Sequence, residues 1–246
     1  MMDNVNILGV TIHHVTIPEA VDCIMGYLEE NGTARAVYTP NSEIIMMGYR
    51  DEELRKILNR ADLRTADGIG VVYASRILKK PLRARAAGFD IACTLFEKMG
   101  KKGKTVYLFG SKPGIAERAG EEINRRWGVT VAGCADGYFD AEKEAAIIAD
   151  INEKRPDVLL VCLGAPKQEK WIDAHREMLN THVCMGLGGS LDVLAGNVKR
   201  APLFFQKTGL EWFYRLCKEP KRIGRMMDLP RFAWTVLRKG KQYPQG

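Results

Sequence analysis

One carboxylate, Asp67, lies between a short apolar segment and a helical pattern. The segment ends at Thr65, and Gly68 and Gly70 follow Asp67 before an apolar helical pattern that runs to Leu78. In α/β folds ligands bind where a strand turns into a helix, and glycine allows a tight turn and the close approach of a substrate. A carboxylate at such a turn would therefore lie where a ligand binds. Asp is also a common N-cap, so the same position suits a purely structural helix cap.

Four further polar or glycine-rich loops follow predicted strands. They are residues 39–43, 110–114, 164–169 and 188–192. In a doubly wound sheet the carboxyl ends of the strands share one edge, and helix N-termini at that edge offer N–H groups and a positive dipole to an anion. The loops therefore predict a diphosphate ligand, although glycines of this kind also serve only to turn the chain.

Lys167 and Gln168 open a predicted helix ahead of Trp171. Either side chain could hold a phosphate or a sugar hydroxyl; the alternative is a solvated first turn in which Glu169 suits the helix dipole. No Asp-x-Asp motif is present that would chelate a divalent metal on a nucleotide diphosphate. The four histidines show neither metal-ligand spacing nor a Ser-His-Asp arrangement. We therefore predict no metal site.

Strand and helix patterns alternate along most of the chain. A β-rich segment, residues 5–12, comes first, and a helical pattern after the 39–43 loop ends at Asn59. The clearest strands are residues 34–38, 105–109, 129–134, 158–163 and 183–187, and the clearest helices are residues 19–30, 115–127 and 142–154. This alternation predicts an α/β fold with a Rossmann-like, doubly wound, mostly parallel sheet. Continuous apolar strands fit a sheet covered on both faces.

Composition is that of an ordinary globular protein. The 246 residues are 46% hydrophobic and 27% charged. Six scattered cysteines without a Cys-x-x-Cys pair indicate reduced thiols and a cytoplasmic setting. The N-terminus lacks the basic and apolar regions of a signal peptide, and no stretch reaches the ~18 apolar residues of a membrane span.

The positive charge is concentrated at the end of the chain. Residues 197–246 hold 12 Lys and Arg against 3 Asp and Glu, and therefore carry the whole excess of the net charge of +7. Such asymmetry suggests a polyanionic partner. Trp212, Phe213 and Trp234 are interleaved with basic residues in an amphipathic helical pattern, which favours a membrane surface over nucleic acid. We predict a core over residues 1–196 and a membrane-associating appendage over residues 197–246.

Seven motifs appear in order along the chain. They are Thr39-Pro40-Asn41-Ser42-Glu43, Thr65-Ala66-Asp67-Gly68, GAPKQEKW at 164–171, GGSLD at 188–192, GNVKRAP at 196–202, GLEWFYRL at 209–216 and EPKR at 219–222. Together they resemble the WecG/TagA/CpsF glycosyltransferases along nearly the whole chain, and the similarity is closest to the wall teichoic acid branch. The combined set is specific, whereas each motif alone is weak.

The resemblance implies a concrete reaction. Such enzymes transfer N-acetylmannosamine from UDP-N-acetylmannosamine to a GlcNAc hydroxyl on diphospho-undecaprenol, in β-1,4 linkage. They invert the sugar and need neither a metal nor a cofactor, which agrees with the missing Asp-x-Asp motif. By motif, Asp67 matches the proposed general base, and Thr39, Asn41 and Gln168 match residues near the reacting sugar. N-acetylmannosaminuronic acid and glucose are donor sugars of similar proteins and stay open as alternatives.

The resemblance also implies that the other candidate residues bind UDP. Without a metal, the charge on the leaving UDP must be met by helix N-termini, backbone N–H groups and Lys or Arg. Tyr138 could stack on uracil, or it could be a core aromatic in a turn. The substrate-binding candidates are Thr39, Asn41, Gly68, Gly110, Ser111, Tyr138, Gly164, Lys167, Gln168, Gly188, Gly189 and Asp192.

For the appendage, the resemblance implies a lid that reaches the membrane and closes over the active site. Arg215, Arg222 and Arg225 would then face the lipid diphosphate or membrane phosphates. The protein would be peripheral on the inner face of the bacterial plasma membrane, with a homo-oligomer possible and no nucleic-acid partner.

Two other classes of protein compete with this interpretation. One is an NAD-type Rossmann oxidoreductase, whose GxGxxG fingerprint is missing. The other is a non-catalytic nucleic-acid binder that uses the basic tail.

Overall fold

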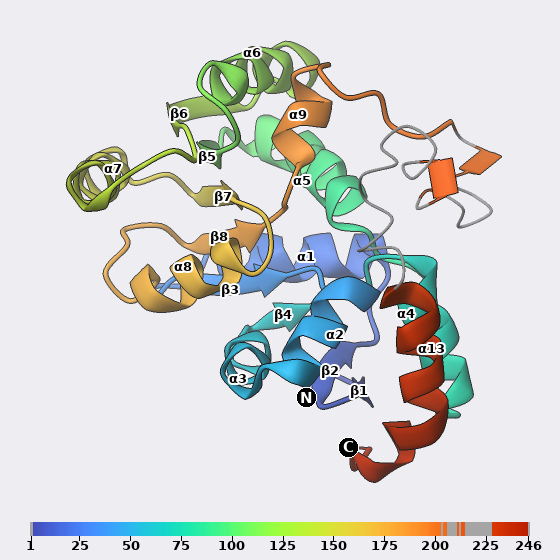
Figure 1. Ribbon diagram of the computed structural model, residues 1–246. Helices are drawn as coiled ribbons and strands as arrows, with labels where there is room; N and C mark the ends of the chain where they lie inside the picture. Colours follow the sequence, from blue (N-terminus) through green and yellow to red (C-terminus); the bar gives the residue numbers. More distant parts are fainter. Residues whose placement is uncertain (1, 203, 206–210, 212, 215–227, 246) are drawn as a thin grey trace.

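Six parallel strands form the central sheet. The computed structural model describes residues 2–202, 204, 205, 211, 213, 214 and 228–245. The strands run in the order β4-β3-β8-β7-β5-β6 (Figure 1). Their bounds are β3 (Arg35–Tyr38), β4 (Leu63–Arg64), β5 (Thr105–Gly110), β6 (Thr130–Ala135), β7 (Val158–Cys162) and β8 (Val183–Gly186). The predicted α/β class with a parallel sheet is confirmed.

Helices cover both faces of this sheet and enclose two hydrophobic cores. One face carries α1 (Ile17–Tyr27), α5 (Gly88–Lys102), α6 (Ile115–Trp127) and α9 (Ser190–Leu194). The other carries α2 (Ser42–Arg50), α3 (Glu52–Asn59), α4 (Ile69–Ile77), α7 (Ala141–Lys154), α8 (Lys167–His175) and α13 (Asp228–Lys239). Successive strand residues serve opposite cores: Val106 and Leu108 face one, Tyr107 and Phe109 the other. This explains why the strands are continuously apolar.

The β-rich segment at the N-terminus forms a separate ribbon. β1 (Asn4–Ile7) and β2 (Val10–His13) pair antiparallel and do not join the six-stranded sheet. Leu8 and Gly9 connect them with φ values of 54° and 90°, and two consecutive positive φ angles are typical of the tight hairpin turn whose twist matches its strands. The ribbon packs against α3 and α4 beside the sheet.

The helical pattern that ends at Asn59 is divided into α2 and α3. Asp51 separates them: it is the C-cap of α2 and the N-cap of α3, with extended backbone angles. Its carboxylate accepts hydrogen bonds from the backbone N–H groups of Glu53 (3.0 Å) and Leu54 (3.1 Å). A side chain that satisfies the free N–H groups of a new helix stabilises the break, so the chain can turn without losing either helix.

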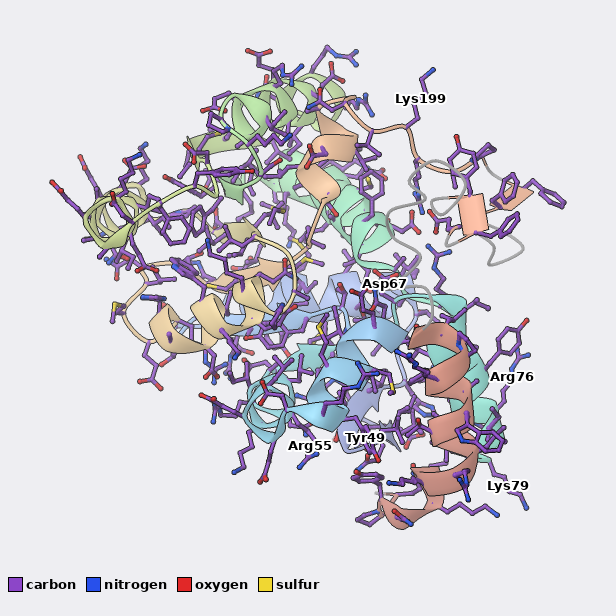
Figure 2. The ribbon with its side chains drawn as sticks, viewed as in Figure 1. Tyr49, Arg55, Asp67, Arg76, Lys79 and Lys199 are labelled. Carbon is purple, nitrogen blue, oxygen red and sulfur yellow. The ribbon has the colours of Figure 1, made fainter. Side chains whose placement is uncertain are left out.

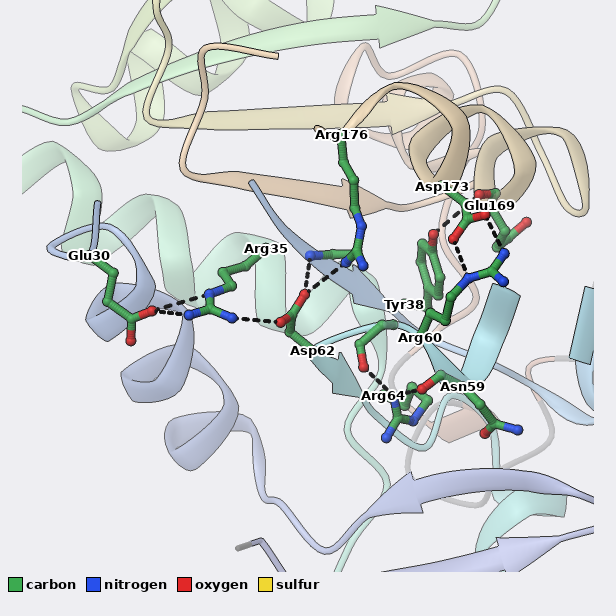
Figure 3. Close-up of polar contacts among 12 residues, drawn as sticks. Glu30, Arg35, Tyr38, Asn59, Arg60, Asp62, Arg64, Glu169, Asp173 and Arg176 are labelled. Atoms are coloured by element: carbon green, nitrogen blue, oxygen red, sulfur yellow. Dashed lines mark hydrogen bonds and ion pairs between the residues drawn. The ribbon is translucent and has the colours of Figure 1, made fainter. Parts of the chain in front are cut away.

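Arg64 at the end of β4 ties the hairpin to the sheet. Its buried guanidinium donates to the backbone carbonyls of Thr11 (2.8 Å), Ala61 and Asn59, the last at 3.0 Å and drawn in Figure 3. The backbone N–H of Arg64 donates to Nδ1 of His13 (3.0 Å). Burial, and secondarily the Arg64 charge, lowers the pKa of His13 to about 4. His13 is therefore neutral in the folded protein at neutral pH.

This pKa predicts a loss of stability in mild acid. Between pH 6.5 and about 4 the unfolded chain binds a proton at His13 that the folded chain does not, so the free energy of unfolding falls as the pH is lowered through this window. In His13→Asn the amide oxygen can still accept from Arg64, and this part of the pH dependence should disappear in urea unfolding. His182→Asn, at a partly exposed histidine, is the matched control, and its free energy of unfolding should keep the same pH dependence. An unchanged pH slope in His13→Asn would contradict the assignment.

α13, near the end of the chain, packs against α2 and α4. Phe232 and Val236 are buried in the core on that face. Beyond α13, Gln245 donates to the carbonyl of Asn6 (2.9 Å) and accepts from its N–H (3.1 Å). The end of the predicted appendage thus completes the packing around the hairpin, while a boundary at 196/197 stays a prediction. Among the described residues, no helix has the length and apolar character needed to cross a bilayer.

Candidate active site

The predicted loops lie together along the carboxyl edge of the sheet, because all six strands are parallel. β3 leads outward to β4 on one side, whereas its other neighbour, β8, is reached from β7. The helices that follow these two strands, α2 after β3 and α9 after β8, lie on opposite faces of the sheet. The chain therefore diverges outside β3 and β8 and leaves a crevice of the kind in which open α/β sheets bind ligands. The loops after β3, β4, β7 and β8 border this crevice.

Asp67 lies beside the loop that follows β3. Its backbone N–H donates to the carbonyl of Pro40 (3.2 Å), and Asp67 itself is half-buried. The N-cap of α4 is Gly68, with a φ of 94° and no side-chain cap bond. Asp67 is therefore not the N-cap residue of α4, as the structural alternative had it. Figure 2 shows Asp67 beside the start of α4.

Thr39 is held in the crevice by a glycine that the sequence did not single out. A Cβ at Gly88, the first residue of α5, would lie 2.8 Å from Thr39 Oγ1 and 2.9 Å from Leu187 Cδ2. Only glycine leaves room for these two side chains to meet the backbone there. Gly88 thus brings together the loop after β3 and the loop after β8. The sequence signal was weak, since Gly88 follows two alanines with no strand before it.

The side chain of Asn41 caps a helix with one atom and borders the crevice with another. Its Oδ1 accepts from the N–H of Ile44 (2.9 Å) and caps α2. Gly68 is adjacent, since a Cβ there would lie 3.9 Å from the Asn41 Cβ. Capping fixes which way the amide points. Its Nδ2 makes no hydrogen bond within the described part of the chain, so this group is the one that can donate to a ligand.

Gln168 connects the loop after β7 to the loop after β8. It is only 3% exposed, its Oε1 accepts from the N–H of Gly188 (2.8 Å), and its Nε2 donates to Oε1 of Glu169 (2.8 Å). Both ends of the amide are engaged by the protein. The side chain is therefore a strut between two loops of the crevice rather than an open polar group at its surface.

Glu169 supports this strut from inside the protein. Burial raises the pKa of its carboxyl, and the hydrogen bond from Gln168 opposes that shift. The backbone carbonyl of Glu169 accepts from the Tyr38 hydroxyl (3.2 Å; Figure 3). The alternative of a solvated first helical turn fails here, because both Gln168 and Glu169 are buried. Sequence reasoning missed this role, because a charged residue in a first turn normally faces water.

A pocket of about 290 Å³ lies farther along the same edge, after β5 and β7. The Ser111 hydroxyl donates to the Asp192 carboxylate (2.8 Å), and this pair forms part of the wall. The turn is tight, because a Cβ at Gly110 would lie 2.3 Å from the carbonyl oxygen of Cys162. The lining residues are Ser111, Lys112, Gly137, Tyr138, Cys162, Leu163 and Asp192.

Tyr138 stands at the rim of this pocket and is 62% exposed. The alternative that it is a core aromatic is therefore wrong, and its ring is available to stack on a base. Lys167 lies near the same rim: its Nζ is 4.0 Å from the centroid of the Phe139 ring and 3.4 Å from the carbonyl of Gly137. The pocket thus combines an aromatic face, a carboxylate and two lysines.

The candidate residues fall into two connected groups. Thr39, Asn41, Asp67 and Gly68 border one end of the crevice, and Gly110, Ser111, Tyr138, Lys167 and Asp192 surround the pocket at the other. The strut from Gln168 to Gly188 lies between them, with Gly164 (φ 77°) and Gly189, the N-cap of α9, in the flanking turns. In the described part of the chain, no three metal-ligating side chains cluster closely enough to hold an ion.

An ion network anchors the start of the predicted appendage. Arg200 pairs with both oxygens of Asp90 (2.5 and 2.8 Å), and Glu211 pairs with Arg85 (2.5 Å). These residues are partly buried, so the pairs are less screened than surface ones. Arg215, Arg222 and Arg225, together with Trp212, lie outside the described residues. Their predicted roles at phosphates and in the membrane stay predictions.

Comparison with known proteins places this architecture in one family. The model of the glycosyl transferase WecG/TagA/CpsF family matches residues 5–245. A relative from Bacillus spizizenii is 39% identical over 86% of this chain and 82% of its own. Relatives from Bacillus subtilis and Staphylococcus aureus are 35% and 34% identical, over 94% and 95% of this chain and 92% of their own.

All three relatives are named N-acetylglucosaminyldiphosphoundecaprenol N-acetyl-beta-D-mannosaminyltransferase. The matches extend through the sheet, the crevice loops and α13, so the similarity covers the complete described architecture. The chain belongs to the WecG/TagA/CpsF family of glycosyl transferases.

Proposed function

We propose that the protein transfers N-acetylmannosamine from UDP-N-acetylmannosamine to the GlcNAc of GlcNAc-diphospho-undecaprenol, in β-1,4 linkage. The product would be the linkage unit of wall teichoic acid or a related cell-surface polysaccharide. The observation that carries this proposal is a carboxylate, Asp67, on the same sheet edge as the pocket beside Tyr138, in a chain whose relatives bear that enzyme name. A uronic acid or glucose donor is the alternative within the family; an NAD-type oxidoreductase has no support left.

UDP fits the pocket end of the crevice. Tyr138 would stack on uracil, and Ser111 with Asp192 would meet its polar edge or the ribose. Lys112, Lys167 and the N-terminus of α6 lie on the same side and would face the diphosphate. The sugar would then extend past the Gln168 strut toward Thr39 and Asn41, where the Asn41 Nδ2 can donate to a hydroxyl.

The reaction is a single displacement. The acceptor hydroxyl attacks the anomeric carbon opposite UDP, the new C–O bond forms as the bond to the diphosphate oxygen breaks, and Asp67 takes the hydroxyl proton. Inversion follows because attack and departure lie on opposite faces. UDP leaves with the electron pair of the broken bond, and positive groups along its path stabilise that charge.

In this scheme Gln168 positions two loops and does not contact the reacting atoms. Its two hydrogen bonds hold the Gly188 loop against α8, which keeps the sugar end and the nucleotide end of the crevice at a fixed separation. A displacement reaction is sensitive to such spacing, because reacting atoms must approach to about 3–3.5 Å.

The proposed function also gives the C-terminal appendage a role at the membrane. The basic appendage would associate peripherally with the inner face of the bacterial plasma membrane. Arg215, Arg222 and Arg225 would bring charge to the lipid diphosphate, where guanidinium geometry suits phosphate. Together with the lysines they would replace a metal ion.

A transfer assay with several UDP-sugars, carried out in excess EDTA, tests the reaction. We expect UDP-N-acetylmannosamine to be used on a GlcNAc-diphospholipid, with UDP-glucose and the uronic acid donor left unused, and EDTA to have no effect. Preference for another donor would move the protein to another branch of the family. Loss of activity in EDTA with recovery in Mg²⁺ or Mn²⁺ would contradict neutralisation by protein cations.

A further inference from the structure

α4 and α13 lie side by side and run in the same direction (Figure 1). At their beginnings, a Cβ at Gly70 would lie 3.6 Å from Leu229 Cδ1; at their ends, a Cβ at Gly240 would lie 2.6 Å from Leu78 Cδ2. The buried residues of α13, Phe232 and Val236, face the protein. Each helix therefore has an outward face, and the two faces adjoin along the whole pair.

Large apolar side chains occupy these outward faces. Tyr73 and Ile77 of α4 are exposed, as are Trp234 and Leu237 of α13; Tyr73 is 53% and Trp234 is 61% exposed. Spacings of four and three residues place each pair on one side of its helix. We call these four side chains the α4/α13 face. Clustered exposure of this kind marks a surface that binds something.

The charged residues along α4 and along α13 after Asp228 are all basic. No Asp or Glu occurs between Ile69 and Phe89 or between Leu229 and Gln245, and Asp67 and Asp228 lie at the starts of the two helices. Arg76 lies over the Tyr73 ring (5.6 Å) and Arg238 over the Trp234 ring (5.3 Å).

Further cations lie nearby at Lys79, Lys239 and Lys241. Within the described part of the chain, no carboxylate pairs with these lysines, Arg76 or Arg238. The face is therefore apolar at its centre and flanked by these five cations.

We propose that the α4/α13 face lies on an anionic lipid surface, with the core helix α4 contributing half of the contact. This rests on the proposed function, which needs a lipid-linked acceptor. Tyr and Trp prefer the headgroup region, and flanking Lys and Arg are attracted to anionic lipid. A second copy of the same face is disfavoured as the occupant, because the cations that flank the two faces would repel each other.

This orientation brings the base to the membrane. Asp67 is two residues before α4, at the end of the face (Figure 2). Arg76 and Lys79 mark the other end of α4, about 13 Å away for a nine-residue helix. With α4 lying along the headgroups, the GlcNAc of a lipid-linked acceptor meets Asp67 at the edge of the contact and need not leave the interface.

The test uses the full chain with Tyr73→Ser/Ile77→Ser and, separately, Arg76→Gln/Lys79→Gln. Controls are Met178→Ser, at an exposed apolar residue after α8, and Lys102→Gln, at the end of α5. Binding is measured by sedimentation with phosphatidylglycerol/phosphatidylcholine vesicles at low salt. Arg76→Gln/Lys79→Gln should bind at least tenfold more weakly, since two basic residues at ~1 kcal/mol each exceed the ~1.4 kcal/mol of a tenfold change. Tyr73→Ser/Ile77→Ser should also bind at least tenfold more weakly, because two apolar side chains are lost from the contact. Both controls should bind as the unaltered protein does.

An activity assay distinguishes a failure of this membrane-contact proposal from a failure of the proposed sugar transfer. The double variants should lose transfer to GlcNAc-diphospho-undecaprenol in vesicles but keep transfer to a water-soluble short-chain analogue. Vesicle binding needs no sugar, so it is informative even if N-acetylmannosamine proves to be the wrong donor. Unchanged vesicle binding in both double variants would overturn the proposal. So would a change in self-association in sedimentation velocity without a change in vesicle binding, because the face would then be a protein contact.

Discussion

Replacing Asp67 with Asn is expected to lower the rate of sugar transfer by about 10²–10⁴-fold, the usual contribution of a positioned general base. Asn has nearly the same size and can stay beside the Pro40 loop, but its amide cannot take the proton of the acceptor hydroxyl. α4 should be preserved, because its N-cap is Gly68 and not Asp67. UDP binding should also be preserved, because the pocket beside Tyr138 does not include Asp67.

The measurement is turnover under saturating donor and acceptor, with UDP binding followed by calorimetry. Asp51→Asn is the matched control: Asp51 caps α3, and Asn caps a helix about as well as Asp. That variant should transfer sugar at the normal rate. Near-normal turnover by a folded Asp67→Asn protein would show that the base is another group.

Replacing Phe232 with Ala should lower the free energy of unfolding by about 3–5 kcal/mol, the usual cost of removing a buried phenyl ring. Phe232 is 2% exposed and belongs to the core on the face of α2 and α4. The loss should be seen in urea unfolding, with faster hydrogen exchange in α13. Because the cavity weakens the contact of α13 with α4, transfer to a lipid acceptor should fall as well.

Trp234→Ala is the matched control on the same helix. Trp234 is exposed, so its removal should change the free energy of unfolding by less than about 0.5 kcal/mol. Equal stability of the two variants would show that α13 is not part of the folded core. The pair thus distinguishes the side of α13 that faces the protein from the side that faces outward.

The fold was predictable because local pattern and burial agree. Segments such as residues 158–163 are apolar throughout, and β7 there is buried on both faces of the sheet. The strand order was not predictable, because it depends on contacts between residues far apart in the chain. The hairpin and the Asp51 break were missed for a related reason: two short strands joined by Leu8 and Gly9 look like one β-rich segment until their turn is seen.

The candidate site was predictable where it depends on strand ends. Parallel strands bring their carboxyl ends to one edge, so the loops containing Thr39, Asp67 and Gly188 had to converge. The roles of Gly88 and Glu169 were not predictable, because each is set by a partner on another element or by burial. In α13 the pattern showed an amphipathic helix but could not tell that Phe232 faces the protein while Trp234 faces outward.

The configuration of the newly formed glycosidic bond tests the central claim most directly. In the transfer assay described above, the disaccharide can be released from the lipid and the one-bond C–H coupling at the N-acetylmannosamine anomeric carbon measured by NMR. A single displacement assisted by Asp67, starting from the α-linked UDP-sugar, predicts a β-linked product. An α-linked product would contradict both the single displacement and the assignment of Asp67 as its base.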